Sequence, residues 1–296
     1  MKKENNKNTK RNNSTWFNVW LNFKKNKLAL FGLFMLIFLV ISAILAPIIA
    51  PYSLSEMDFT SMDKSPSLKH ILGTDKMGRD IFSRLLYAGR ISLSVGLIAE
   101  AIALTIGTIL GTISGYFGGK IDTFLMRLVD MFNSFPFILL SITVVAVIGP
   151  SIYNIMIVLG ILSWTGPCRI IRGQFLQIKN KEFVEGARAM GASNFRIIFK
   201  HMLPNALAPL LVSATLGVGG AIMTEAALSY LGLGVQPPTP SWGNMLQAAN
   251  DLHALETKPW LWIPPGLSIL LSVLSINFIG DGLRDSLDPK AQKNQK

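Results

Sequence analysis

Uncharged apolar runs alternate with short clusters of charged residues along most of the chain. A bilayer core of about 30 Å needs about 20 residues of α-helix, so an apolar run of that length predicts a membrane-spanning helix. Six runs approach or exceed this length, at residues 28–50, 91–115, 125–148, 152–171, 207–230 and 261–280. The pattern predicts an all-α membrane protein with six transmembrane helices.

The composition narrows the class of protein further. Half of the 296 residues are apolar and 15% are charged, whereas an ordinary soluble domain has about 25% charged residues. These values argue against a soluble two-domain enzyme and a disordered regulator. The single cysteine, Cys168, cannot form an intrachain disulfide, which argues against a secreted disulfide scaffold. Run 28–50 is too long for a signal peptide, so we expect it to be a retained anchor.

Lysine and arginine residues flank the apolar runs instead of forming one aromatic-interleaved face. The net charge of +11 is therefore better explained by membrane topology than by nucleic-acid binding. Eight of them precede residue 28 and seven lie between residues 169 and 200. Loop 51–90 has six, but it is long and also contains five acidic residues. Because basic residues favour the cytoplasmic side, both termini are predicted to be cytoplasmic, and the Asn/Lys-rich stretch at the N-terminus is predicted to be a disordered, solvated tail.

Some positions inside the apolar runs indicate more than membrane spanning. Gly107, Gly111 and Gly115 form a stripe of small residues at a spacing of four, which predicts close helix packing or a subunit contact. Glu100 lies about 14 Å into its span, and intramembrane carboxylates face a bundle interior or an aqueous path. We expect Glu100 either to line a translocation path or to pair with a polar neighbour. Glu225 lies near the outer end of its span, where an interfacial hydrogen-bonding role is expected.

The most informative polar segment is residues 182–204, on the cytoplasmic side. Phe183, Ala187 and Met190 recur at helical spacing and predict a short amphipathic helix with these side chains on its apolar face. Gly191 can take the left-handed conformation that ends such a helix. Ser193 or Asn194 can cap a second helix that runs until Pro204. The first helix is too short to be stable alone, so it lies on lipid headgroups or is presented to a partner.

The same segment resembles the EAA motif of ATP-binding-cassette (ABC) importer permeases, EAA-x3-G-x9-I-x-LP. The matching positions are Glu185, Ala187, Gly191, Leu203 and Pro204. Gly186 replaces the second-position alanine and His201 replaces the isoleucine. The resemblance implies a type I ABC importer permease fold, in which these seven residues belong to a coupling helix that docks on an ATPase subunit.

Other segments are similar to the dipeptide/oligopeptide branch of that family. They are HILGTD at 70–75 with its continuation to residue 84, EAALSYLGLGVQPPTPSWG at 225–243, and GDGLRDSLDP at 280–289. The resemblance implies import of short peptides, with import of a nickel chelate as the alternative. It also implies a location in the bacterial cytoplasmic membrane, in contact with membrane lipid. The protein partners that it implies are a homologous permease subunit, two ATPase subunits and an extracytoplasmic substrate-binding protein.

The sequence shows no pattern typical of catalysis. Residues 115–120 come closest to a phosphate-binding loop, but the first glycine is missing and Ile121 replaces the Ser or Thr. The three histidines are far apart, so no metal site is predicted. We therefore expect no cofactor, with ATP bound by partner subunits and not by this chain. Asp281, Arg284 and Asp285 are predicted to order the C-terminal tail through local ion pairs.

These observations divide the chain into four parts. We predict a cytoplasmic tail at 1–27, a first transmembrane helix with an external module at 28–86, a permease domain at 87–281 with the coupling helix at 182–204, and a C-terminal tail at 282–296. One alternative of a different class stays open, a carrier that works without ATP. Such a carrier would transport its substrate alone and would not depend on Glu185 or Gly191.

Overall fold

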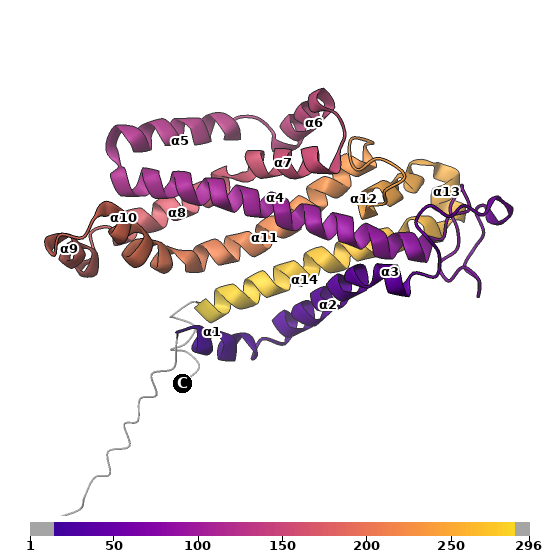
Figure 1. The fold of residues 1–296 in the computed structure, drawn as a ribbon, viewed down its shortest axis with the longest axis horizontal. Helices are drawn as coiled ribbons and strands as arrows, with labels where there is room; N and C mark the ends of the chain where they lie inside the picture. Colours follow the sequence, from indigo (N-terminus) through magenta and orange to yellow (C-terminus); the bar gives the residue numbers. More distant parts are fainter. Residues whose placement is uncertain (1–14, 288–296) are drawn as a thin grey trace, which may run out of the picture.

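The computed structural model describes residues 15–287, and within this range the chain is a bundle of helices without a named strand. The helices longer than eight residues are α1 (Thr15–Phe23), α2 (Lys27–Ile44), α4 (Ile81–Phe117), α5 (Gly119–Asn133), α6 (Phe137–Ile148), α7 (Ile152–Ser163), α8 (Thr165–Ile178), α11 (Leu203–Tyr230) and α14 (Ile263–Leu287). The shorter ones are α3 (Ala46–Ile49), α9 (Glu182–Ala189), α10 (Asn194–Arg196), α12 (Trp242–Met245) and α13 (Leu252–Thr257). Figure 1 shows α9 and α10 at one end of the bundle and α12 and α13 toward the other, which we call the α9 end and the α13 end.

Five helices of the described range are long and apolar enough to cross a membrane, and a bent pair raises the number to six. This agrees with the six predicted spans. Helix α4 packs against α7 and α8 on one side and against α11 on another, while α2 packs against α14. The exposed side of α2 carries large apolar side chains, including Phe31, Phe34 and Phe38, which suit contact with lipid.

The third predicted span, residues 125–148, is not one continuous helix. Helices α5 and α6 are bent by 83° at the break between Asn133 and Phe137. Pro136 explains the break, because proline has no backbone N–H and disfavours the helical conformation of the residue before it. The third span is therefore two helices that meet at an angle.

Other helix bounds also differ from the prediction. Helix α4 has 37 residues and begins ten residues before the predicted start. The Asp80 side chain caps it, accepting from the Ser83 amide at 2.8 Å. The predicted span 152–171 comprises α7 and α8, which together reach Ile178. Helix α11 begins at Leu203 instead of 207, and α14 ends at Leu287, beyond the predicted end at 280 and the predicted domain boundary after 281.

The two ends of the chain correct a further expectation. Helix α1 lies inside the segment predicted to be only a tail, whereas the Asn/Lys-rich stretch lies outside the described residues. The predicted local ion pairs of Asp281, Arg284 and Asp285 do not form within residues 15–287. Because α14 continues through these positions, their side chains point outward from a helix, and Asp285 Oδ2 accepts a hydrogen bond from Asn26 Nδ2 at 3.4 Å.

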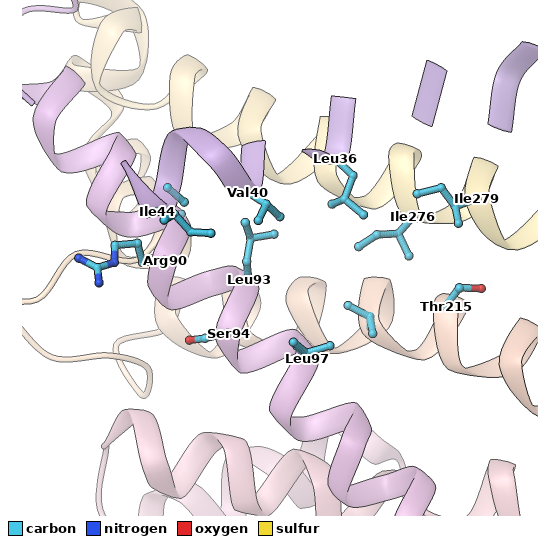
Figure 2. A pocket seen from close by; sticks show the side chains of 13 residues that line it. Leu36, Val40, Ile44, Arg90, Leu93, Ser94, Leu97, Thr215, Ile276 and Ile279 are labelled. Carbon is cyan, nitrogen blue, oxygen red and sulfur yellow. The ribbon is translucent and has the colours of Figure 1, made fainter. Parts of the chain in front are cut away.

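An apolar groove of about 490 Å³ lies between α2, α4, α11 and α14. Figure 2 shows aliphatic side chains from α2, α4 and α14 facing one another across it, with Arg90 at one edge and directed away from them. Such a lining offers few hydrogen-bond partners to a polar molecule. A site for a polar ligand is therefore expected in other parts of the bundle.

Candidate functional site

Helix α9 is anchored to the bundle by two small side chains. Val184 is fully buried and Ala187 is 2% exposed, and both belong to a buried cluster that includes Phe175 of α8 and Ile197. Tyr116, near the end of α4, donates a hydrogen bond from its hydroxyl to Asn194 Oδ1 at 2.7 Å. Helix α9 is thus packed against α8 and the segment leading into α11, and the hydrogen bond joins the end of α4 to the start of α10.

The predicted apolar face of α9 is only partly correct. Ala187 is buried as expected, but Phe183 is 42% exposed and Met190 is 83% exposed. The inward face carries Val184 in their place, because the small side chains let α9 approach its neighbours closely. In so short a helix two apolar stripes fit the sequence, and only the tertiary contacts decide which one faces inward.

Gly191 ends α9 as predicted. Its φ is +78°, in the left-handed region that favours glycine. Its N–H donates to the Arg188 carbonyl at 3.0 Å, and the Ala192 N–H donates to the Ala187 carbonyl at 3.1 Å. These two bonds form a Schellman motif, which satisfies the last carbonyls of the helix.

The segment after Gly191 does not end at Pro204. Ser193 caps it, as one of the two predicted candidates, and accepts from the Arg196 amide at 3.4 Å. The helix then passes through a π-helical stretch at Ile197–Met202 directly into α11. Pro204 follows the π-helical stretch as the second residue of α11, where it has no backbone N–H to donate to the preceding turn.

The α9 end presents a polar and apolar surface to its surroundings. Glu185, Gly186 and Pro204 are exposed, while His201 and Leu203 are half-buried. Phe195 is 70% and Phe199 is 52% exposed, and their ring centroids lie 4.4 Å apart. With Phe183 and Met190 they form what we call the α9 surface, the four exposed apolar side chains at this end.

Glu100 lines a cavity inside the bundle. The cavity measures about 630 Å³ and is lined by residues of α4, α7, α8 and α11 and of the α5–α6 bend. Glu100 is 5% exposed, and its carboxylate accepts no hydrogen bond from residues 15–287. Gly217 of α11 lies directly opposite, since a Cβ atom at Gly217 would be 2.2 Å from the Glu100 carboxyl carbon.

The break in the third span forms one wall of this cavity. Phe132, Asn133 and Phe135 line it where α5 ends, and Phe137 lines it where α6 begins. Thr165 of α8 donates a hydrogen bond to Asn133 Oδ1 at 3.1 Å, which fixes the end of α5. The sequence places Glu100 near mid-membrane, but the bend that makes room beside it was not predicted.

The glycine stripe of α4 lies against α8. A Cβ atom at Gly107 would be 2.7 Å from the Trp164 carbonyl oxygen, and one at Gly111 would be 2.5 Å from that of Cys168. At Gly115 a Cβ atom would be 2.5 Å from the Cβ of Phe175. Since real Cβ atoms do not approach so closely, only glycine allows α4 and α8 to pack at this distance.

Glu225 lies in a buried hydrogen-bonded network near the α13 end. It is fully buried within the protein, and the predicted hydrogen bonding is present. Its Oε2 accepts from Ser92 Oγ of α4 at 3.0 Å, and its Oε1 accepts from Ser229 Oγ at 2.6 Å. Ser241 donates to Ser229 at 3.4 Å and extends the network to the start of α12. The serines were missed because nothing local separates them from other serines in apolar helices.

Comparison with known proteins places this fold and these segments in a family. The family model described as "Binding-protein-dependent transport system inner membrane component" matches residues 107–293. A second model, "N-terminal TM domain of oligopeptide transport permease C", matches residues 14–67.

Curated relatives agree over most of the chain. The dipeptide transport system permease protein DppC of Alkalihalophilus pseudofirmus is 45% identical over 94% of this chain and 90% of its own length. The oligopeptide transport system permease protein OppC of Bacillus subtilis is 43% identical over 96% of this chain and 93% of its own length. The inward-facing MetNI methionine ABC transporter is 19% identical with a TM-score of 0.58, over 72% of this chain and all of that chain, and shares the fold. The chain belongs to the family of binding-protein-dependent transport system inner membrane components.

Proposed function

We propose that this chain is the permease subunit of an ATP-driven importer of short peptides and forms half of the translocation path. A homologous permease subunit supplies the other half, two ATPase subunits hydrolyse ATP, and an extracytoplasmic binding protein delivers the peptide. The relatives named as dipeptide and oligopeptide permeases support the choice of cargo. The α9 end and both termini are cytoplasmic in this proposal, and the α13 end faces the extracytoplasmic side.

The observation that carries the coupling step is the α9 surface, because it leaves apolar side chains exposed at the end of a helix that is itself well anchored. Exposed apolar groups rimmed by polar ones are typical of protein interaction sites. When two ATPase subunits close on ATP, they draw the two α9 helices together. Val184 and Ala187 transmit this displacement to α8 and α11, and the permease changes from inward-facing to outward-facing.

The proposed path runs through the Glu100 cavity. A carboxylate without a hydrogen-bond partner among residues 15–287 is available to a cationic group of the cargo, such as a peptide ammonium. We expect Glu100→Gln to lower the rate of peptide uptake while leaving assembly intact. Unchanged transport in this variant would remove Glu100 from the path.

A pair of glycine substitutions sharpens the test of the cavity. Gly217→Ala brings a methyl group against the Glu100 carboxylate, whereas Gly220→Ala, in the same helix and cavity, has no atom within 4 Å of the new Cβ. We expect Gly217→Ala to reduce uptake at least tenfold and Gly220→Ala to change it less than twofold. Adding Glu100→Ala to Gly217→Ala should relieve the crowding without restoring uptake, because the carboxylate is then absent. Equal uptake by both glycine variants would contradict the proposed path.

The test of the whole proposal is ATP hydrolysis by the importer in liposomes, with and without the peptide-loaded binding protein. We expect peptide-stimulated hydrolysis that is lost or uncoupled in Gly191→Arg and in Met190→Glu. Met190→Leu keeps an apolar side chain at the α9 surface and serves as the matched control. Stimulation by a nickel chelate and not by peptides would change the cargo, and peptide uptake without any ATPase subunit would overturn the mechanism.

A further inference from the structure

A second polar cavity lies at the α13 end, away from Glu100. It measures about 550 Å³ and lies between the loop that precedes α4 and the segment from Pro237 to Leu261. Its lining includes basic and acidic side chains in similar number, among them Arg84 and Asp63. This volume falls within the range of small-molecule sites, about 300–1,000 Å³.

Arg84 brings a buried guanidinium with an unsatisfied N–H group to this cavity. The residue is 6% exposed, and its Nη1 is buried without a hydrogen-bond partner in residues 15–287. The nearest carboxylate oxygen is Asp75 Oδ2, 3.9 Å from Arg84 Nε, which is too long for a hydrogen bond. That oxygen already accepts from Arg79 Nε at 2.7 Å. A buried guanidinium is costly without an acceptor, so the site favours an anionic group.

Asp63 brings an unpartnered acceptor of the opposite charge to the same cavity. Its Oδ2 accepts from Lys258 Nζ at 2.6 Å, while its Oδ1 is buried without a partner in the described range. The backbone of Asp63 has a φ of +54°, and its N–H donates to the Asp75 carbonyl at 3.0 Å. Both the backbone and one carboxylate oxygen are therefore fixed, and Oδ1 is left for a donor.

The walls of the cavity are held in place by interactions that a ligand does not have to form. Thr74 links the loop to itself, donating to the Ser61 carbonyl and accepting from the Lys64 amide at 3.0 Å. Trp260 donates from Nε1 to the Thr74 carbonyl at 3.4 Å, joining the loop to the segment after α13. A preformed site loses less conformational entropy when it binds a ligand.

We propose that this cavity binds a free short peptide as a zwitterion, with its carboxylate at Arg84 and its ammonium group at Asp63. The inference rests on the proposed peptide import and adds a receiving site on the extracytoplasmic side of the permease itself. A zwitterion is the ligand class that satisfies both unpartnered groups at once. A single anion or a single cation would leave either Asp63 Oδ1 or Arg84 Nη1 without a hydrogen-bond partner.

The test measures binding of a radiolabelled dipeptide to the assembled importer in nanodiscs without its binding protein. Three unlabelled competitors are compared: the free dipeptide, its C-terminal amide and its N-acetyl derivative. We expect saturable binding in which each blocked peptide competes at least about tenfold more weakly. This experiment uses the unmodified protein. Absence of saturable binding, or equal competition by all three peptides, would overturn the proposal.

Variants of the chain test which residue binds the peptide carboxylate and which binds the ammonium group. Arg84→Gln should weaken binding of the free peptide about tenfold and abolish the preference over the amide. Asp63→Asn should abolish the preference over the N-acetyl peptide. Lys76→Gln is the matched control, because it removes the same charge from an exposed side chain at the rim of the same cavity. Equal effects of Arg84→Gln and Lys76→Gln would contradict a specific carboxylate contact.

Two further measurements separate this inference from the proposed function. Peptide uptake with the binding protein present tests import itself, and intact uptake without any peptide binding to the permease overturns only the external site. Affinity for the binding protein is measured in parallel. If Arg84→Gln weakens binding-protein docking and not peptide binding, the cavity receives a protein side chain and the proposal is wrong.

Discussion

The two ends of the bundle differ in how they treat polar and apolar groups. At the α9 end, Phe183 and Met190 remain exposed, and the helix is held by the buried side chains of Val184 and Ala187. At the α13 end, Glu225 and its serine partners are buried inside a hydrogen-bonded network. Exposed apolar groups favour a partner that comes and goes, whereas a buried polar network fixes one arrangement. In the proposed importer, the α9 end is therefore the one that a partner contacts, and the α13 end keeps one geometry.

The largest expected effect is at the buried network of the α13 end. Glu225→Ala leaves the Ser92 and Ser229 hydroxyls without their acceptor and creates a cavity, so we expect a loss of about 3 kcal/mol in the free energy of unfolding. Thermal unfolding in nanodiscs measures this loss. Glu256→Gln is the control, because Glu256 is exposed, and we expect it to be neutral. Similar free energies of unfolding for the two variants would contradict the stabilising role of the buried network at the α13 end.

A smaller effect is expected in the seam between α4 and α8, which connects the α9 end to the bundle. Gly111→Ala places a Cβ atom 2.5 Å from the Cys168 carbonyl oxygen and forces the helices apart, at about 2 kcal/mol. Gly173→Ala, on α8, meets no atom within 4 Å and is the matched control. We expect only the first to lower the unfolding temperature, and an unchanged temperature would contradict the close packing.

At the α9 end itself, two glycines should respond in opposite directions. Neither has an atom within 4 Å of a new Cβ, so crowding does not separate them. Gly191→Ala forces a left-handed conformation on alanine and costs about 1 kcal/mol, while Gly186→Ala, inside α9, stabilises the helix by about 0.5–1 kcal/mol. Hydrogen-exchange protection of the α9 amides measures both. The same sign for the two variants would contradict the Schellman turn.

The smallest effect concerns an exposed ion pair in the loop before α4. Hydrogen bonds from Thr60, Ser61 and Lys69 hold the pKa of Asp58 well below its usual range, and Asp58 raises the pKa of Lys69. The carboxylate contribution is complete above the ordinary Asp pKa of about 3.9, declines below it, and is fully lost only when pH falls through the lowered pKa of the folded state. The lysine contribution is present below about pH 10.4 and is lost as pH rises beyond it.

Asp58→Asn should therefore lower the exchange protection of the Thr60 amide slightly near pH 7, and the difference should shrink toward pH 3. The effect is small because both side chains are well solvated. Adding Lys69→Gln to Asp58→Asn should change nothing further at the ion pair. A difference that grows toward pH 3 would show that the amide is protected by something other than the carboxylate.

The sequence allowed prediction of the features that depend on local patterns. Apolar run length located the membrane helices, and Gly191 marked the end of α9 because a left-handed glycine at that position satisfies the last carbonyls. The bend before Phe137 has a local cause in Pro136, yet length alone favoured a single span.

The remaining features depend on contacts between distant residues. Ser92 and Glu225 are 133 positions apart, and nothing in either neighbourhood indicates the other. Arg84 and Asp63 line one cavity because the loop before α4 folds back onto the segment after α12. Likewise, the choice between Phe183 and Val184 for the inward face of α9 follows from what α9 packs against and not from its own period.

The continuity of residues 194–230 has a mechanical consequence. This stretch of α10, the π-helical turns and α11 has 37 residues, which corresponds to a rod of about 55 Å. Gly217, in contact range of Glu100, lies about 35 Å from the α9 end of the rod and about 20 Å from its other end. A rigid rod that pivots at this point moves its ends in opposite directions, with the larger excursion at α9. Such a rotation can close the proposed path at one end of the helix while it opens the path at the other end. The π-helical stretch lies on the longer side of the pivot, and this is where the helix would bend first.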